Sequence, residues 1–148
     1  MPRARRSGKA ARATACRCRS GGLLARPTEE DHRQLLDLGW DYIDLAAVNL
    51  YPFEQTVTKP GVTHVEAIEN IDIGGVALIR AAAKNYERVT LLCDPADYTT
   101  ALDAFRSGGV TDEIRLELAA KGFALTARYD AAIYDYFSNV IASEAKQS

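Results

Sequence analysis

Residues 70–85 of this 148-residue chain read NIDIGGVALIRAAAKN, and this stretch decides how the fold is organised. An acid between two isoleucines precedes a Gly-Gly pair, and a run of strong helix formers follows. Val76, Ile79 and Ala83 share one face of the predicted helix. The glycines allow the backbone to approach another group closely, and free N–H groups at the helix start favour a polar or anionic partner. The stretch therefore predicts a tight turn that leads into a core helix and is also a candidate binding site.

Two apolar runs on either side of this stretch predict strands. Residues 42–49 and 88–93 are mostly apolar without clear alternation, which is typical of strands covered on both faces in a parallel sheet. Residues 54–61 are expected to form a linker with a Pro-Gly turn. Helix starts are predicted at four capping residues: Thr28, Thr63 (a capping box with Glu66), Asp94 and Thr111. This order predicts an α/β fold with three layers and a mainly parallel sheet.

The last predicted helix carries a long apolar stripe at helical spacing, which we expect to pack against the core. The stripe consists of Leu116, Ala120, Phe123, Ala127, Ala131, Tyr134 and Phe137.

The basic residues are distributed unevenly along the chain, which bears on what kind of protein it is. Residues 1–26 hold eight of the 18 basic residues and no acid, so ten basic residues face all 20 acids in the remainder. We expect residues 1–20 to be an unstructured basic leader. A nucleic-acid arm or a transit peptide are alternatives, although no aromatic residue is present there for stacking on bases.

The three cysteines lack the spacing of a zinc site or a disulfide framework, which favours a reducing cytoplasm and no metal. No run is long enough to span a membrane.

The segment after the first predicted strand is a candidate for ligand contact. Residues 49–53 read NLYPF, so Asn49 and Tyr51 follow the carboxyl end of that strand. In open α/β sheets, ligands bind beyond these strand ends.

Three of these stretches together resemble a known family. They are residues 49–53, residues 71–85 and residues 94–98, which reads DPADY. In this order they are similar to the IMP cyclohydrolase domain of the bifunctional purine-biosynthesis proteins, which also carry AICAR formyltransferase activity. The resemblance covers residues 21–137 and implies a methylglyoxal-synthase-like fold.

The resemblance also implies a reaction, in which FAICAR closes to IMP with loss of water and without a cofactor or metal. Tyr51, Asp72 and Lys84 match the family's catalytic positions. Asp72 would orient the carboxamide and help remove its proton, with its reactivity tuned by burial and by Lys84. Lys84 and Tyr51 would donate to the formyl oxygen or the departing water. The substrate-binding positions are expected at Asn49, Ile73, Gly74 and Gly75, with backbone N–H groups completing the oxyanion site. The family is expected to form homodimers.

Both ends of the chain depart from the family pattern. Residues 1–20 lack the segments that bind the substrate phosphate in the family, and residues 138–148 read as an unrelated tail. We therefore expect a partial cyclohydrolase domain over residues 21–137, without the formyltransferase domain and with poor stability and weak or no activity. Two alternatives are a non-catalytic nucleotide-binding module with the same fold and a nucleic-acid binder that uses the basic leader.

Overall fold

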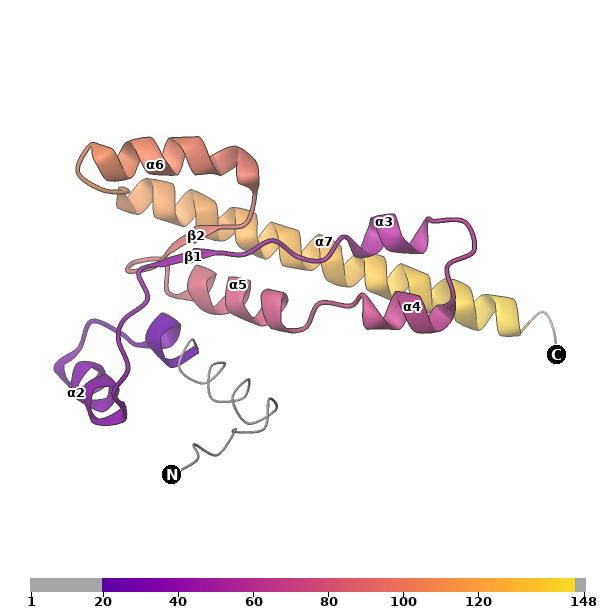
Figure 1. Ribbon diagram of the computed structural model, residues 1–148, viewed down its shortest axis with the longest axis horizontal. Helices are drawn as coiled ribbons and strands as arrows, with labels where there is room; N and C mark the ends of the chain where they lie inside the picture. Colours follow the sequence, from indigo (N-terminus) through magenta and orange to yellow (C-terminus); the bar gives the residue numbers. More distant parts are fainter. Residues whose placement is uncertain (1–19, 146–148) are drawn as a thin grey trace, which may run out of the picture.

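The computed structural model describes residues 20–145 of the chain (Figure 1). Residues 20–24 are helical. The elements that follow are α2 (Glu29–Leu38), β1 (Leu45–Ala47), α3 (Phe53–Val57), α4 (His64–Glu69), α5 (Gly74–Lys84), β2 (Thr90–Leu92), the 3₁₀ turn η1 (Pro95–Asp97), α6 (Tyr98–Arg106) and α7 (Asp112–Glu144).

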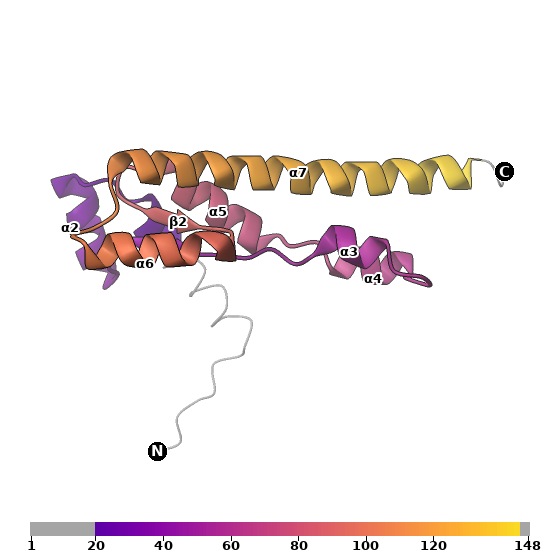
Figure 2. The ribbon, with the colours of Figure 1, turned by 90° about the horizontal axis from the view of Figure 1, so that it is seen from above.

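The two strands pair in parallel and lie between helices. Ala46 of β1 is opposite Leu91 of β2. Leu91 packs in one core cluster with Ile79 of α5, whereas Leu92 packs in a second cluster with Ala101 of α6. Because successive strand residues point to opposite faces, β2 is covered from both sides. Figure 2 shows α6 on one side of β2 and α5 on the other, and α7 contributes Ala119 to the first cluster and Leu118 to the second. The predicted α/β fold with a parallel sheet is confirmed.

The first strand is shorter and more exposed than the sequence predicts. Of residues 42–49 only Leu45–Ala47 form β1, and Ala46 alone of these is buried. Leu45 is 44% exposed because α6 packs on β2 and leaves the corresponding face of β1 open. The expectation that both faces are covered is therefore wrong for β1, while all three residues of β2 are buried as predicted.

The predicted helix caps are confirmed. The Thr28 side chain accepts from the Asp31 N–H at the start of α2, and Gly39 ends that helix with a φ of 66°. At α4, Thr63 and Glu66 form the complete capping box. Local hydrogen bonding decides these boundaries, so they could be predicted from nearby residues.

The predicted linker over residues 54–61 is partly wrong, since α3 occupies its first half. Phe53 starts α3 and is 1% exposed. Its ring packs edge-on against Tyr129 and Tyr136 of α7, with centroid distances of 6.1 and 5.8 Å. This aromatic contact holds the short helix against α7, beyond the end of the sheet (Figure 1).

The long helix α7 buries a different face from the one predicted. Its buried residues are Leu118, Ala119, Gly122, Thr126 and Tyr129. All seven residues of the predicted apolar stripe are exposed instead. Small residues explain the difference, because a Cβ on Gly122 would collide with Leu91 of β2 and lie 3.2 Å from Ile79 of α5. Close approach of the backbones, and not the size of the apolar side chains, selects the core face of α7.

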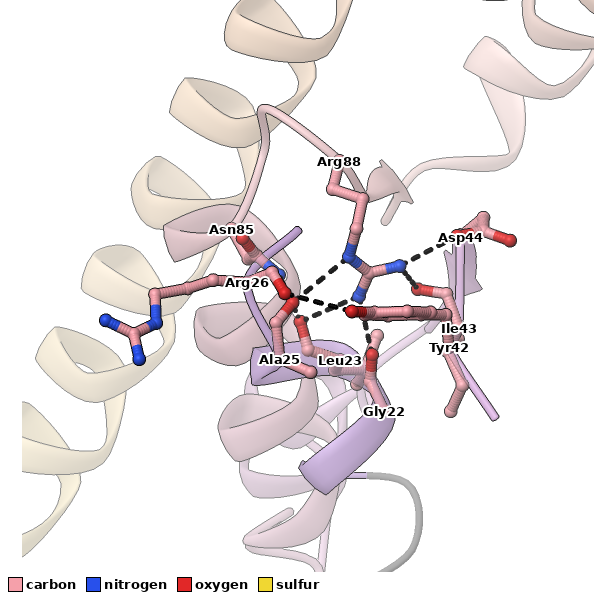
Figure 3. A network of polar contacts seen from close by, with 9 residues as sticks. All are labelled: Gly22, Leu23, Ala25, Arg26, Tyr42, Ile43, Asp44, Asn85 and Arg88. Carbon is pink, nitrogen blue, oxygen red and sulfur yellow. Dashed lines mark hydrogen bonds and ion pairs between the residues drawn. The ribbon is translucent and has the colours of Figure 1, made fainter. Parts of the chain in front are cut away.

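Arg88 fastens the first described segment to the core (Figure 3). Its guanidinium donates to the carbonyls of Gly22, Leu23, Ala25 and Ile43, and it pairs with the Asp44 carboxylate at 2.7 Å. The group also lies 4.6 Å from the ring centroid of Tyr42. Asn85 adds hydrogen bonds to the carbonyls of Leu23 and Ala25. These bonds satisfy carbonyl groups of residues 22–25 that water would otherwise have to solvate.

The predicted domain limits rest partly on residues outside the described part. Residues 1–19, which make up nearly all of the predicted basic leader, and residues 146–148 of the predicted tail lie outside it. The described residues 138–144 continue α7. Within residues 20–145, no helix is long and apolar enough to cross a membrane.

Candidate active site

A cavity of about 460 Å³ opens at the carboxyl ends of the two strands. Asn49 follows β1 by two residues, and Cys93 follows β2 directly. The cavity is lined by Asn49, Leu50, Tyr51, Pro52, Phe53, Glu54, Gln55, Cys93, Pro95, Leu125 and Tyr129. Because parallel strands end at the same edge, segments far apart in the sequence meet here, as the sequence predicts for residues 49–53.

Asp72 connects this rim to the start of α5. One carboxylate oxygen accepts from the Gly75 N–H at 2.6 Å, and the other accepts from the Tyr51 N–H at 3.4 Å. The carboxylate therefore stabilises the positive N-terminal end of α5 and fastens the Tyr51 loop to it. Asp72 is half-buried, but Ile73 beside it is 76% exposed. The expectation of an acid buried between two isoleucines is wrong, because the Ile73 side chain points away from the core.

The two glycines of the turn differ in their surroundings. A Cβ on Gly75 would lie 2.7 Å from an oxygen of Asp72 and 2.8 Å from Leu50, whereas a Cβ on Gly74 would meet nothing within 4 Å. Gly75 is thus required by the Asp72 carboxylate itself. Among residues 20–145, the N–H groups of Ile73 and Gly74 have no hydrogen-bond acceptor, so they can donate to a bound molecule.

Asn49 and Tyr51 lie on the same rim. The Asn49 side-chain amide donates to the Tyr98 hydroxyl at 3.2 Å, which links the loop after β1 to the start of α6. Tyr51 is 60% exposed, and its hydroxyl has no hydrogen-bond partner within the described part of the chain. Its phenol can therefore turn toward a molecule bound at the rim.

Lys84 does not join these residues. It is the last residue of α5, whose first residue is Gly74, so the helix alone separates them by about 15 Å along its axis. Lys84 is exposed. The structure thus brings Tyr51, Asp72, Asn49 and the Gly-Gly turn together and leaves Lys84 at the far end of the helix. The expected tuning of Asp72 by Lys84 finds no support in this arrangement.

Tyr129 belongs to the site but was missed in the sequence. Its hydroxyl accepts from the Asp72 N–H at 2.8 Å and donates to the Asn70 carbonyl at 3.3 Å, and the residue is 6% exposed. Burial raises the pKa of this hydroxyl above its ordinary value. No local signal marks Tyr129, since it lies on α7, 57 residues from Asp72 along the chain.

A second polar cluster lies beside the cavity. Lys121 of α7 pairs with Asp94 at 2.7 Å and Asp97 at 2.8 Å. Hydrogen bonding to these carboxylates raises the pKa of Lys121, and the same lysine lowers the pKa of Asp94. The Cys93 thiol is free and buried, and burial raises its pKa. No group of three or more His, Cys, Asp or Glu side chains that could hold a metal is found within residues 20–145.

Comparison with known proteins agrees with the geometry. Residues 82–148 match the family model of the AICARFT/IMPCHase bienzyme. The chain is also 53% identical over 128 residues to the bifunctional purine biosynthesis protein PurH of Chlorobium phaeobacteroides (strain BS1), an alignment that covers 84% of this chain. The chain is related to these bienzymes. The PurH protein of Bacillus subtilis (strain 168) is 52% identical over 123 residues, or 82% of this chain.

The bienzyme relatives are much longer than this chain. The alignments cover 24% of the Chlorobium and of the Bacillus protein. The crystal structure of ForH matches 80% of this chain and 63% of its own, with a TM-score of 0.69 and 39% identity. The resemblance recognised in the sequence is thereby confirmed. The family-model match extends to residue 148 and so includes the predicted tail.

Proposed function

We propose that the cavity beside the Asp72 turn binds FAICAR and that its residues close FAICAR to IMP, the reaction implied by the resemblance to the bienzymes. The hydrogen bonds of Asp72 to Gly75 and Tyr51 at the cavity rim are the main support. They hold the Asp72 carboxylate and the backbone of the Tyr51 loop close to the unpaired N–H groups of Ile73 and Gly74. Identity above 50% to two PurH proteins supports the same assignment.

The reaction needs a group that accepts a proton and a group that stabilises an oxyanion. The carboxamide nitrogen attacks the formyl carbon, a C–N bond forms, and water then leaves. Asp72 is in a position to orient the carboxamide and to take its proton, and the Ile73 and Gly74 N–H groups can donate to the formyl oxygen. Tyr51 would donate to the same oxygen or to the departing water, and Asn49 would hold the aminoimidazole. None of these steps uses a metal or a cofactor.

Lys84 lies apart from the rest of the proposed set, because α5 holds it about 15 Å from the turn. Its contribution is therefore tested separately from that of Asp72. Tyr129 is proposed as a positioning residue, since its hydroxyl holds the Asp72 backbone.

The test measures both binding of IMP by calorimetry and ring closure of FAICAR by absorbance, using the purified chain. Asp72→Asn keeps the shape of the side chain and removes its basicity, so turnover should fall about 10²–10⁴-fold. Asp130→Asn is the matched control, because Asp130 is an exposed acid of α7. It should leave binding and turnover unchanged.

Each outcome decides between the proposed functions. Turnover that Asp72→Asn abolishes and Asp130→Asn preserves supports the cyclohydrolase. Saturable IMP binding without turnover makes the chain a nucleotide-binding module. If neither binding nor turnover is measurable while the chain remains folded, the proposal is wrong. If Lys84→Ala closes FAICAR at the wild-type rate, Lys84 is not one of the catalytic residues.

The setting of this reaction follows from its substrate. A water-soluble nucleotide precursor and a buried free thiol at Cys93 favour the reducing cytoplasm. The chain is not proposed to bind nucleic acid, because its similarity to the purine-biosynthesis bienzymes supports the cyclohydrolase instead.

A further inference from the structure

Tyr98 connects the start of α6 to the loop that follows β1. Its hydroxyl accepts a hydrogen bond from the side-chain amide of Asn49, with 3.2 Å between nitrogen and oxygen. Asn49 lines the cavity of the candidate site, whereas Tyr98 is not one of the lining residues. The contact therefore joins a residue of the site to a residue outside its lining.

The Asn49 side chain has little else to fix its orientation. Asn49 is exposed and lies in the loop between β1 and α3. Within residues 20–145, Tyr98 is the one hydrogen-bond partner of its side chain, and the side-chain carbonyl oxygen receives no hydrogen bond. An exposed asparagine samples several side-chain orientations unless a hydrogen bond selects one of them.

The ring of Tyr98, in contrast, is held by apolar packing. Tyr98 is half-buried and packs against the cluster of Leu92, Ala101 and Leu118, which come from β2, α6 and α7. Because these three elements surround the ring, its position does not depend on the contact with Asn49.

The turn directly before Tyr98 is fastened to α7. Lys121 of α7 pairs with Asp94 at 2.7 Å and with Asp97 at 2.8 Å. The Asp94 carboxylate also accepts a hydrogen bond from the Ala96 N–H at 2.9 Å and so caps η1. Since η1 ends directly before Tyr98, these bonds fix the start of α6. Tyr98 is thus the fixed member of the pair, and Asn49 is the member whose side chain would otherwise rotate.

We propose that Tyr98 is a positioning residue, whose hydroxyl holds the amide nitrogen of Asn49 and so presents the free carbonyl oxygen of Asn49 to an N–H group of the bound ligand. This inference rests on the proposed function, because it takes FAICAR as the ligand. The carboxamide and the formamide of FAICAR both carry N–H groups, and the closed ring of IMP retains one. An amide carbonyl oxygen accepts hydrogen bonds and cannot donate them, so it disfavours a ligand that places another acceptor there.

The expected effect is on binding and not on the chemical step. The Asn49 carbonyl can accept the same hydrogen bond before and during ring closure, so loss of its orientation should raise KM and leave kcat nearly unchanged. Tyr98→Phe removes the hydroxyl and keeps the ring in its apolar cluster. It should raise the KM for FAICAR and the Kd for IMP about 3–10-fold, the usual effect of one neutral hydrogen bond.

A double-mutant cycle tests whether Tyr98 acts through Asn49. Ring closure of FAICAR and calorimetry with IMP are measured for the wild type, Tyr98→Phe, Asn49→Ala and the double variant. Adding Tyr98→Phe to Asn49→Ala should change KM and Kd by less than about twofold, because the side chain that Tyr98 positions is already absent. Tyr134→Phe is the matched control and should behave as the wild type, since Tyr134 is 71% exposed on α7.

Nuclear magnetic resonance tests the contact itself, without any ligand. The side-chain NH₂ signals of Asn49 are identified as those that disappear in Asn49→Ala. They should shift in Tyr98→Phe and keep their positions in Tyr134→Phe. Unchanged signals in Tyr98→Phe would overturn the proposal whatever the activity of the chain.

The kinetic outcomes separate positioning from a merely structural role. A rise in KM and Kd that Tyr98→Phe causes in the presence of Asn49 but not in Asn49→Ala supports the proposal. A lower kcat at unchanged KM, or equal effects in both backgrounds, shows that the hydroxyl only stabilises the fold and contradicts it. A wild-type chain that neither binds IMP nor closes FAICAR overturns the proposed function and this inference together. Failure of the proposed function is therefore seen in the wild type, whereas failure of the inference alone is seen only in the variants.

Discussion

At the scale of single residues, the turn before α5 depends on one glycine and not on its neighbour. Both glycines start the helix, but only Gly75 is in contact with the Asp72 carboxylate and Leu50. Substituting each glycine in turn therefore distinguishes the steric need for glycine at residue 75 from the general effect of glycine on helix stability.

We predict that Gly75→Ala destabilises the chain by about 1–3 kcal/mol, because the new Cβ must displace Asp72 or Leu50. Gly74→Ala is the matched control, since it places a methyl group in open space and reduces the freedom of the unfolded chain. It should be neutral or stabilise the fold by up to about 1 kcal/mol. Urea denaturation measures both, and equal effects of the two substitutions would contradict this role of Gly75.

The Tyr129 hydroxyl gives a second prediction at this scale. Tyr129→Phe leaves the Asp72 N–H without its acceptor, so the free energy of unfolding should fall by about 1–3 kcal/mol. Tyr134→Phe on the same helix is the control and should change stability by less than about 0.5 kcal/mol, because Tyr134 is 71% exposed. Amide hydrogen exchange at Asp72 should accelerate in Tyr129→Phe alone; unchanged exchange would show that the hydroxyl does not hold the turn.

At the scale of elements, Arg88 joins the segment at residues 22–25 to the segment at residues 43–44 through polar contacts, beside the apolar packing of Leu23 and Ile43. Its planar group reaches carbonyls of residues 22–25 and of Ile43 together with the Asp44 carboxylate. A lysine carries the charge but lacks the fork that makes these bonds simultaneously.

Arg88→Lys should therefore destabilise the chain by about 2–4 kcal/mol, since several carbonyls lose a charged donor at once. Arg33→Lys on the exposed side of α2 is the control and should have almost no effect. Limited proteolysis locates the change: cleavage within residues 20–28 should accelerate in Arg88→Lys. Cleavage at the wild-type rate would mean that this segment is held by other contacts.

At the scale of the whole molecule, hydrogen-bonded carboxylates make stability depend on pH. Arg26 lowers the pKa of Asp31 from 3.8 to about 2 by hydrogen bonding, and the pKa values of Glu66, Asp94 and Glu113 are lowered as well. A lowered pKa in the folded state means that stability is present above the unfolded pKa and is lost as pH falls through the folded one.

We therefore predict that the free energy of unfolding is nearly constant between about pH 5 and about pH 8 and falls between about pH 5 and about pH 2. Asp31→Asn should be less stable than wild type above about pH 4.5 and should approach it near pH 2, where Asp31 itself becomes protonated. Asp130→Asn, which removes an exposed acid, is the control and should follow the wild-type curve. Parallel curves for Asp31→Asn and wild type over this whole range would contradict the assignment.

The sequence by itself determined the local features of this molecule. The caps at Thr28 and Thr63, the start of α5 at the Gly-Gly pair and the buried strand β2 follow from residues within a few positions of each other. The motifs near Asn49, Asp72 and Asp94 were sufficient to recognise the related bienzymes. Residues of the first and third motifs line the cavity, and Asp72 is hydrogen-bonded to the Tyr51 N–H at its rim.

Tertiary structure decided which faces meet. The apolar stripe of α7 is exposed because Gly122 and Ala119 allow closer packing on a neighbouring face of the helix, and this choice depends on the shapes of α5 and β2. The tertiary structure also places Tyr129 against Asp72, although 57 residues of chain separate them. It leaves Lys84 at the opposite end of α5 from the Gly-Gly turn. Such contacts join residues that no local pattern connects. The sequence therefore predicted the Asp72 turn of the candidate site but not the residues, such as Tyr129, that pack around the turn.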